Sequence, residues 1–310
     1  MPMDATTHPN QTLPTPTPRR RVSRSDRAAA LALVPLWFVA LFVYVGTVLW
    51  TVGISFTDSR ILPSSSFVGL TQYAELAGNK HWNRSLHNLA VFGSLFVLGT
   101  MVAGFLLAVA LDRRIRAEGA FRTIFLFPYA LSLVITGLVW QWMMNPTSGI
   151  QAAMRGYGWE GFTFDWTTRR DMAIYALVIA GIWQASGVVM AIMTAGLRSI
   201  DQEIWKAAAV DGIPARRVYL RVVLPMMTPS LLTSLVLLAT IVVKSYDLVV
   251  ALTDGGPGNA TEVPAKFVME YLFNRQNIAL ASAAATVMLV LTLLALLPMA
   301  VYRRMQGGRS

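Results

Sequence analysis

Six long apolar runs, separated by polar segments, occupy most of the chain. Each exceeds the roughly 20 residues that a helix needs to cross about 30 Å of hydrocarbon. None has the two-residue alternation of a membrane barrel strand, so they predict helical spans. The first is also too long for the apolar part of a secretory signal peptide. We therefore expect an all-α, polytopic membrane protein with a six-helix bundle, its spans covering residues 28–56, 88–111, 123–144, 172–197, 228–250 and 279–302.

Basic residues between the runs indicate which loops face the cytoplasm. Segments 1–27, 112–122, 198–225 and 303–310 hold five, four, five and three Lys or Arg residues, whereas the alternate loops hold three, three and two. Cytoplasmic loops carry the excess of positive charge. Both termini and segment 199–225 are therefore expected in the cytoplasm. Residues 1–27, rich in Pro and Thr and then in Arg, are expected to be a disordered basic tail, with a membrane domain over 28–304 and a short tail over 305–310.

Composition supports a membrane protein. Of the 310 residues, 55% are hydrophobic and only 14% are charged, against about 25% in soluble domains. The net charge of +10 could suggest nucleic acid, but its placement in alternate loops argues for membrane topology instead. The absence of cysteine excludes disulfides and thiol catalysis, and the three dispersed His residues do not form a convincing metal set.

The polar segment 199–225 predicts two short helices joined at a corner. Asp201 is a good N-cap, and Glu203 lies in the first turn, where the helix dipole favours a carboxylate. Gly212 fits the position after the last turn, with a positive φ, and Pro214 cannot continue the same helix. A second helix is expected through Tyr219. The segment is therefore expected to be a compact protrusion rather than a flexible loop.

This corner resembles the cytoplasmic "EAA" loop of ABC importer permeases, which docks on an ATPase subunit. Lys206 stands where the family has its first Glu, which puts a specific salt bridge at that point in doubt. The resemblance implies that the helix over 207–212 couples the chain to an ATPase dimer. ATP and Mg²⁺ would then be held by that partner, with no cofactor in this chain. The residues that carry the resemblance are Ala207, Ala208, Asp211, Gly212, Tyr219, Leu224 and Pro225, and Glu203 is assigned to the same surface.

A second informative stretch begins in the fifth run. Lys244 and Asp247 lie there three residues apart, which would place them on one helix face. Charges at that depth normally face a cavity or a partner. The pair either stabilises helix packing by self-neutralisation or lines a polar pathway, and both alternatives stay open. The Gly-rich turn that follows lacks the Gly-Lys-Ser/Thr ending of a P-loop, so it does not predict a nucleotide site.

Tyr246-Asp247, Gly255-Gly256-Pro257 and Thr261-Glu262 resemble the permeases of carbohydrate ABC importers. The resemblance implies that Gly255, Gly256 and Pro257 form a loop at the outer mouth of the pathway. Sugars need hydrogen-bonding side chains beside apolar faces. We therefore expect a substrate pathway between the fourth and fifth spans, although helix packing is the better explanation of any single Trp taken alone. Its expected residues are Trp183, Gln184, Gly187, Lys244, Tyr246 and Asp247.

The resemblance implies a transport subunit rather than an enzyme, in a bacterial or archaeal cytoplasmic membrane. Its expected partners are membrane lipid, a second permease subunit, an ATP-binding subunit dimer and an extracytoplasmic sugar-binding protein, with no nucleic acid. The narrower expectation for the substrate is an α-glucoside or another oligosaccharide. Alternatives are a polyol or glycerol phosphate as substrate, or an ion-coupled secondary transporter, although no inverted repeat is evident. A membrane enzyme would need convergent catalytic side chains, which the spans lack.

Overall fold

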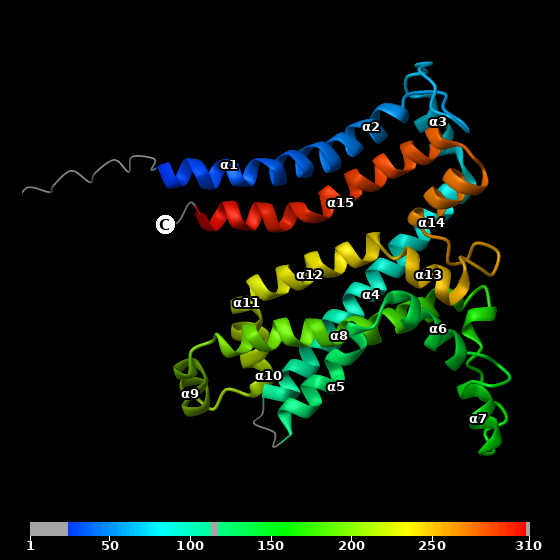
Figure 1. Ribbon diagram of the computed structural model, residues 1–310. Coiled ribbons are helices and arrows are strands. Elements are labelled where there is room, and N and C mark those ends of the chain that lie inside the picture. The colour runs from blue at the N-terminus through cyan, green and yellow to red at the C-terminus, as the bar shows by residue number, and fades with distance from the viewer. Residues whose placement is uncertain (1–23, 113–116, 308–310) are drawn as a thin grey trace, which may run out of the picture. The chain divides into compact units, whose positions relative to one another are not determined.

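The computed structural model describes residues 24–112 and 117–307, which are mostly helical and contain no strand beyond one isolated bridge between Thr57 and Phe67. Figure 1 shows these elements. The helices are α1 (Arg24–Val39), α2 (Gly46–Ile54), α3 (Thr71–Gly78), α4 (Lys80–Asp112), α5 (Glu118–Ala130), α6 (Leu133–Met143), α7 (Ile150–Gly156), α8 (Ala173–Arg198), α9 (Gln202–Val210), α10 (Ala215–Val218), α11 (Leu224–Met226), α12 (Thr228–Val243), α13 (Tyr246–Thr253), α14 (Pro264–Met269) and α15 (Ile278–Gly307). One short 3₁₀ turn, η2 (Trp166–Thr168), and three π turns, η1 (Ala40–Val45), η3 (Tyr219–Val223) and η4 (Glu270–Asn274), complete the list.

Two compact units make up the chain, Met1–Trp50 and Thr51–Ser310. In the described part of the first unit, α1 and η1 lead into α2 without a loop. The expected disordered tail over 1–27 falls largely outside the described residues. Its last residues, from Arg24, belong to α1. Of the expected C-terminal tail, residues 305–307 continue α15.

Four helices are long and apolar enough to cross a membrane, and the number becomes six when each of two bent helix pairs is counted as one span. The four are Ala32–Ile54, Lys80–Asp112, Ala173–Arg198 and Ile278–Leu297. The second of them begins eight residues before the apolar run over 88–111 that predicted it. Its polar first turns explain the difference, because helix formation does not require an apolar sequence.

The third predicted span is not one straight helix, which corrects the prediction. The axes of α5 and α6 differ by 100°. Pro128 lies near the end of α5, Leu131 is extended, and the Ser132 hydroxyl caps α6 by accepting from the Ile135 amide at 3.2 Å. A hydropathy profile does not reveal such a break, because all of these residues lie in one apolar run.

The fifth predicted span is also interrupted. α12 ends at Val243 and α13 begins at Tyr246, so Lys244 and Ser245 form a turn between two helices. At the other end of α12, its axis lies at 72° to the segment Ala215–Met226. The prediction of a single helix over 228–250 is therefore wrong at its C-terminal third.

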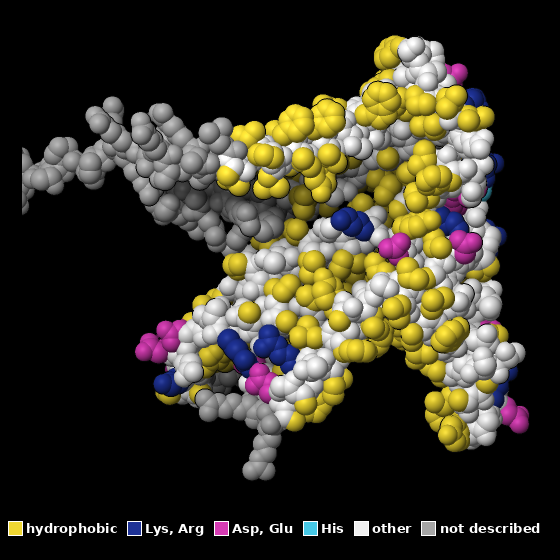
Figure 2. Space-filling view, in the orientation of Figure 1, with side chains coloured by type: hydrophobic (Ala, Val, Ile, Leu, Met, Phe, Trp, Pro, Cys, Tyr) yellow, Lys and Arg dark blue, Asp and Glu magenta, His cyan; other side chains and the backbone are white. Residues whose placement is uncertain are grey.

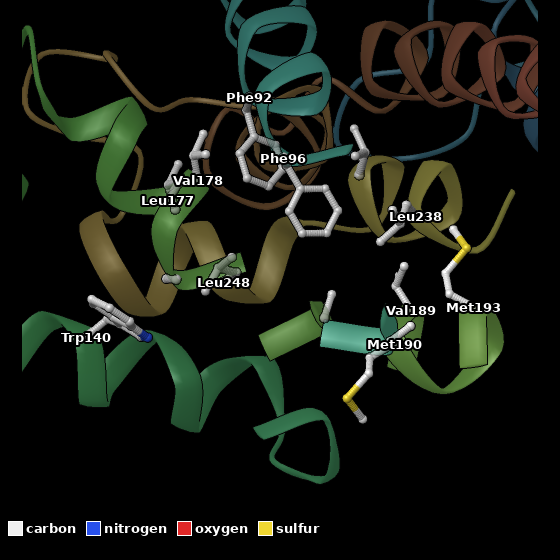
Figure 3. Packing of buried hydrophobic residues seen from close by; sticks show 14 of the residues in the cluster. Phe92, Phe96, Trp140, Leu177, Val178, Val189, Met190, Met193, Leu238 and Leu248 are labelled. Carbon is white, nitrogen blue, oxygen red and sulfur yellow. The ribbon is translucent and has the colours of Figure 1, made fainter. Parts of the chain in front are cut away.

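Close contact between α4 and α8 forms the centre of the second unit, as Figure 3 shows for Phe92, Phe96, Val189 and Met190. Small residues make the contact close. A Cβ at Gly181 would lie 2.8 Å from the Phe96 ring, and one at Gly104 would overlap Val189. A smaller cluster joins α3, α4, α14 and α15 around Trp82 and Phe267, whose ring centroids are 5.3 Å apart.

Candidate functional sites

The polar corner after α8 has the local structure that its sequence predicts. Asp201 Oδ1 accepts a hydrogen bond from the Glu203 amide at 3.0 Å and so caps α9. At the other end the amide of Ile213 donates to the Ala208 carbonyl (3.0 Å) and that of Gly212 to the Ala209 carbonyl (3.3 Å). These two bonds make a Schellman motif, and Gly212 has the positive φ of 63° that it requires. The N-cap and the conformation of Gly212 are confirmed.

One face of α9 packs against aromatic side chains, whereas its C-terminal tip is exposed. Trp205 packs on Tyr219 with ring centroids 5.3 Å apart, and Tyr219 packs on Phe105 of α4 at 6.3 Å. In contrast, Val210 is 87% exposed, and Asp211 and Gly212 are exposed beside it. Figure 1 places α9 at one end of the second unit, away from α7 and α13. The corner is therefore a fixed protrusion with an uncovered tip.

The remaining residues assigned to this corner also divide into packed and exposed ones. Ala208 is half-buried, whereas Glu203 and Ala207 are exposed. Leu224 and Pro225 lie in α11, the last turn before α12. The expected second helix forms as two short pieces, α10 and η3, because the chain passes into a π turn at Tyr219.

Arg198, at the end of α8, ties this corner to two other helices. Its Nη2 lies 2.5 Å from Glu118 Oε1 of α5, and its Nε lies 3.7 Å from Asp112 Oδ1 of α4. These three residues line a cavity of about 610 Å³ that also includes Trp205 and Tyr219. Figure 2 shows acidic and basic side chains gathered next to α9. Sequence reasoning missed this group, whose only signal is the opposite charge at the ends of three apolar runs.

The expected pathway residues of α8 lie in the packed interior. The Trp183 ring meets Trp140 of α6 edge-on at 6.0 Å. Gln184 is buried, and its Nε2 donates to the Leu131 carbonyl at 3.4 Å, at the break between α5 and α6. Gly187 faces the Phe125 carbonyl so closely that a Cβ would overlap it. These three residues therefore hold α8 against the bent pair.

Lys244 and Asp247 are both exposed. Lys244 lies in the turn between α12 and α13, and Asp247 lies in the first turn of α13. The expectation that they share one face of a continuous helix is wrong, because α12 ends at Val243, before Lys244, and Asp247 belongs to α13. Within the described residues neither takes part in an ion pair. Tyr246, in contrast, lines a hollow together with residues of α14 and η4.

The Gly-rich loop after α13 is a tight turn held by side chains. Gly255 has φ 79°, and the Thr261 hydroxyl donates to the Gly256 carbonyl at 2.8 Å. Pro257 follows in the same turn. Lys266 of α14 forms an ion pair with Asp254 Oδ1 at 2.5 Å and also donates to the Asp254 carbonyl. The loop is thus fixed at both ends.

Next to this loop is a buried carboxylate that sequence reasoning did not single out. The Glu262 side chain is 8% exposed, and its Oε2 lies 3.5 Å from Nδ1 of His81 at the start of α4. Asn88 Nδ2 donates to the Glu262 carbonyl at 2.9 Å and to the Asn259 carbonyl at 3.0 Å. Burial raises the pKa of Glu262, and the charge of His81 opposes that rise.

Comparison with known proteins decides the family. The family of binding-protein-dependent transport system inner membrane components matches residues 97–307, about two thirds of the chain. The chain belongs to this family. A probable ABC transporter permease of Pyrococcus horikoshii is 38% identical to the permease, over 86% of this chain and 92% of its own length. The xylose/arabinose import permease XacH of Haloferax volcanii is 32% identical, over 91% and 89%.

The fold of the permease is also that of a solved ABC transporter. A chain of a bacterial transporter that imports the acidic polysaccharide alginate matches 91% of this permease and 97% of its own length, with a TM-score of 0.74 and 19% identity. The family and its relatives make the permease an inner-membrane transport component rather than an enzyme. The region that matches the family, residues 97–307, contains α8, the α9 corner and the Gly-rich loop after α13, so every residue predicted to act in transport lies inside it.

Proposed function

We propose that this permease is a transmembrane subunit of an ATP-driven importer that carries a sugar across a bacterial or archaeal cytoplasmic membrane, with both termini in the cytoplasm. The α9 corner carries the proposal. A capped helix that is anchored by the packing of Trp205 on Tyr219, and whose end at Asp211 is exposed, can transmit a displacement without bending. The relative XacH, a xylose/arabinose import permease, supports a saccharide substrate.

In this mechanism an ATPase dimer binds ATP and Mg²⁺ and moves when it closes. Its motion reaches the permease through residues 207–212, which are the end of α9 and the turn that follows it. This subunit and a second permease subunit then rock between inward-facing and outward-facing forms. An extracytoplasmic sugar-binding protein delivers the substrate. ATP and the loaded binding protein can shift the equilibrium only through their different affinities for the two forms. Both are proposed to favour the outward-facing one.

The proposed substrate pathway runs along α8 and α13. Trp183, Gln184 and Gly187 position the wall, while Lys244, Tyr246 and Asp247 supply its polar groups. Gly255, Gly256 and Pro257 form the outer gate. The narrower proposal is an α-glucoside or similar oligosaccharide, with a polyol or glycerol phosphate as the alternative within the same class. An ion-coupled secondary transporter has no use for the α9 corner.

Co-purification tests the docking assignment. The tagged permease is extracted from membranes of its own host, and ATP hydrolysis and the subunits that accompany it are measured. We expect an ATPase subunit to accompany the wild type and to be lost with Asp211→Arg, which reverses the charge at the uncovered tip. The matched control is Glu160→Arg, an exposed acid in the loop 145–171. Equal retention of the ATPase by both variants would refute the assignment.

A further inference from the structure

A small polar hollow lies where α13, α14 and η4 meet. Its volume is about 200 Å³, and it opens beside the Gly-rich outer loop. Tyr246 and Met269 also line an adjacent apolar hollow of about 360 Å³ against α15. The polar and apolar hollows therefore meet at these two side chains. The residues that give the polar hollow its chemistry are Tyr246, Asp254, Lys266, Glu270, Phe273 and Asn274.

Several groups in the polar hollow retain hydrogen-bonding capacity. The Tyr246 hydroxyl makes no hydrogen bond to the described residues. Asn274 Nδ2 donates to Glu270 Oε2 at 2.6 Å, which leaves the amide oxygen of Asn274 available as an acceptor. The Phe273 side chain is 64% exposed at the rim. A phenol, an amide and an aromatic face suit a ring that carries hydroxyl groups on its edge and C–H groups on its face.

The charges in and around the hollow disfavour the binding of an anion. The Lys266 ammonium is already bound to the Asp254 carboxylate and carbonyl. Outside the hollow, Arg275 Nε lies 3.7 Å from Glu270 Oε1, and its guanidinium lies over the Tyr271 ring. An entering phosphate or carboxylate would thus meet Asp254 and Glu270 and find both neighbouring cations engaged. Like charges at such distances repel, whereas a neutral sugar carries no such penalty.

We infer that this polar hollow is an outer subsite for a neutral saccharide, and that Asp254 selects against acidic sugars by keeping Lys266 paired. The inference rests on the proposed function and narrows its substrate class to neutral sugars. It also assigns Tyr246 as the hydrogen-bond partner of the sugar. Asp254 gains a role in selectivity in addition to its structural role as the C-cap of α13.

Equilibrium binding to the detergent-solubilised complex tests this inference. The probes are maltose and digalacturonate, a neutral and an acidic disaccharide, measured without the binding protein because that protein would impose its own selection. We expect the wild type to bind maltose at least about tenfold more tightly than digalacturonate. Tyr246→Phe removes only the hydroxyl and should weaken maltose binding about fivefold, because a sugar hydroxyl loses its partner.

Asp254→Asn is the decisive variant. Asn tolerates the left-handed conformation of this position, where φ is 49°, so the turn should persist while Lys266 loses its carboxylate partner and keeps only the backbone carbonyl. We expect digalacturonate binding to improve until the preference for maltose falls below about threefold. Glu160→Gln, an exposed acid elsewhere, is the control and should change neither affinity.

Several results of these binding measurements would overturn the inference of a neutral-sugar subsite. Weak or equal binding of both probes by the wild type, or an unchanged preference in Asp254→Asn, would overturn the inference. A wild type that prefers digalacturonate would overturn it too, while leaving the importer itself intact. Loss of the proposed function has a separate signature, which is a complex without an ATPase subunit whatever its affinity for maltose.

Discussion

Gly212 ends α9 with a positive φ in open space, because a Cβ added at this position would have no atom within 4 Å of it. Substitution therefore acts through the backbone alone. We expect Gly212→Val to cost about 1–2 kcal/mol at the corner and to abolish ATPase-coupled uptake, while the protein still reaches the membrane. Gly212→Asn is the matched control, because Asn adopts this conformation readily. Normal uptake in the Val variant would contradict the role of the corner.

Glu262 gives a pH-dependent prediction. Because burial raises its pKa, the folded protein holds the proton more tightly than the unfolded chain does. The stability that this contributes is complete below the ordinary glutamate value of about 4.3 and is lost as pH rises through the raised value.

Glu262→Gln removes the titration and keeps the shape of the side chain. The wild-type complex should therefore lose more thermal stability than the variant complex when the pH is raised from about 4.5 to about 7. The measurement is the midpoint of thermal inactivation of each complex at both pH values. Parallel pH profiles would show that Glu262 does not titrate in this range.

At the residue scale, what could be predicted from the sequence was local. Asp201 and Gly212 act within four residues of themselves, so the pattern of one turn is enough to assign them. Arg198 could not be assigned, because Glu118 lies 80 residues away in the chain. Glu262 and His81 are farther apart still, and only the fold brings them together.

At the scale of elements, Gly187 makes a strong prediction about the contact between α8 and α5. A Cβ there would overlap the Phe125 backbone carbonyl, which no rotamer change can relieve. We expect Gly187→Ala to destabilise the complex by about 1–3 kcal/mol or more. Gly119→Ala is the control, since Gly119 of α5 has free space around it and Ala favours a helix. Thermal inactivation of both variants in detergent is the measurement, and equal stability would contradict the close contact.

The helical elements were predictable as apolar runs, but their breaks were not. Ser132 and the pair Lys244–Ser245 lie inside runs whose hydropathy is continuous. A Pro in the sequence indicates a break only weakly, because Pro35 lies inside α1 and Pro128 lies just before the bend. The direction of each bend depends on the helices packed around it.

At the scale of the whole molecule, the absence of cysteine makes the proposed topology directly testable. We expect Asp211→Cys to be protected from a membrane-impermeant maleimide in intact cells and labelled after permeabilisation. Tyr157→Cys, at an exposed position in the opposite loop, should be labelled in both conditions. Labelling of the Asp211 variant from outside would mean that the topology is inverted, and the importer proposal would fall with it.

The class of the molecule could be read from its sequence, because six apolar runs and alternating basic loops are properties of the whole chain. The substrate could not. Tyr246 was expected in a pathway, but its neighbours Lys266, Glu270 and Asn274 come from a helix and a turn that begin 18 or more residues later. Only their meeting in one hollow distinguishes a neutral ligand from an acidic one.

The interlocked glycines of α4 and α8 have a mechanical consequence. With Gly104 seated against Val189 and Gly181 against Phe96, neither helix can slide along the other without collision. We therefore expect a displacement applied at α9 to pass along α8 as the movement of one rigid helix. We expect any change of shape to concentrate instead at the breaks between helices, beside Leu131 and Ser245. A cross-link across either break should arrest the transport cycle more effectively than a cross-link between α4 and α8.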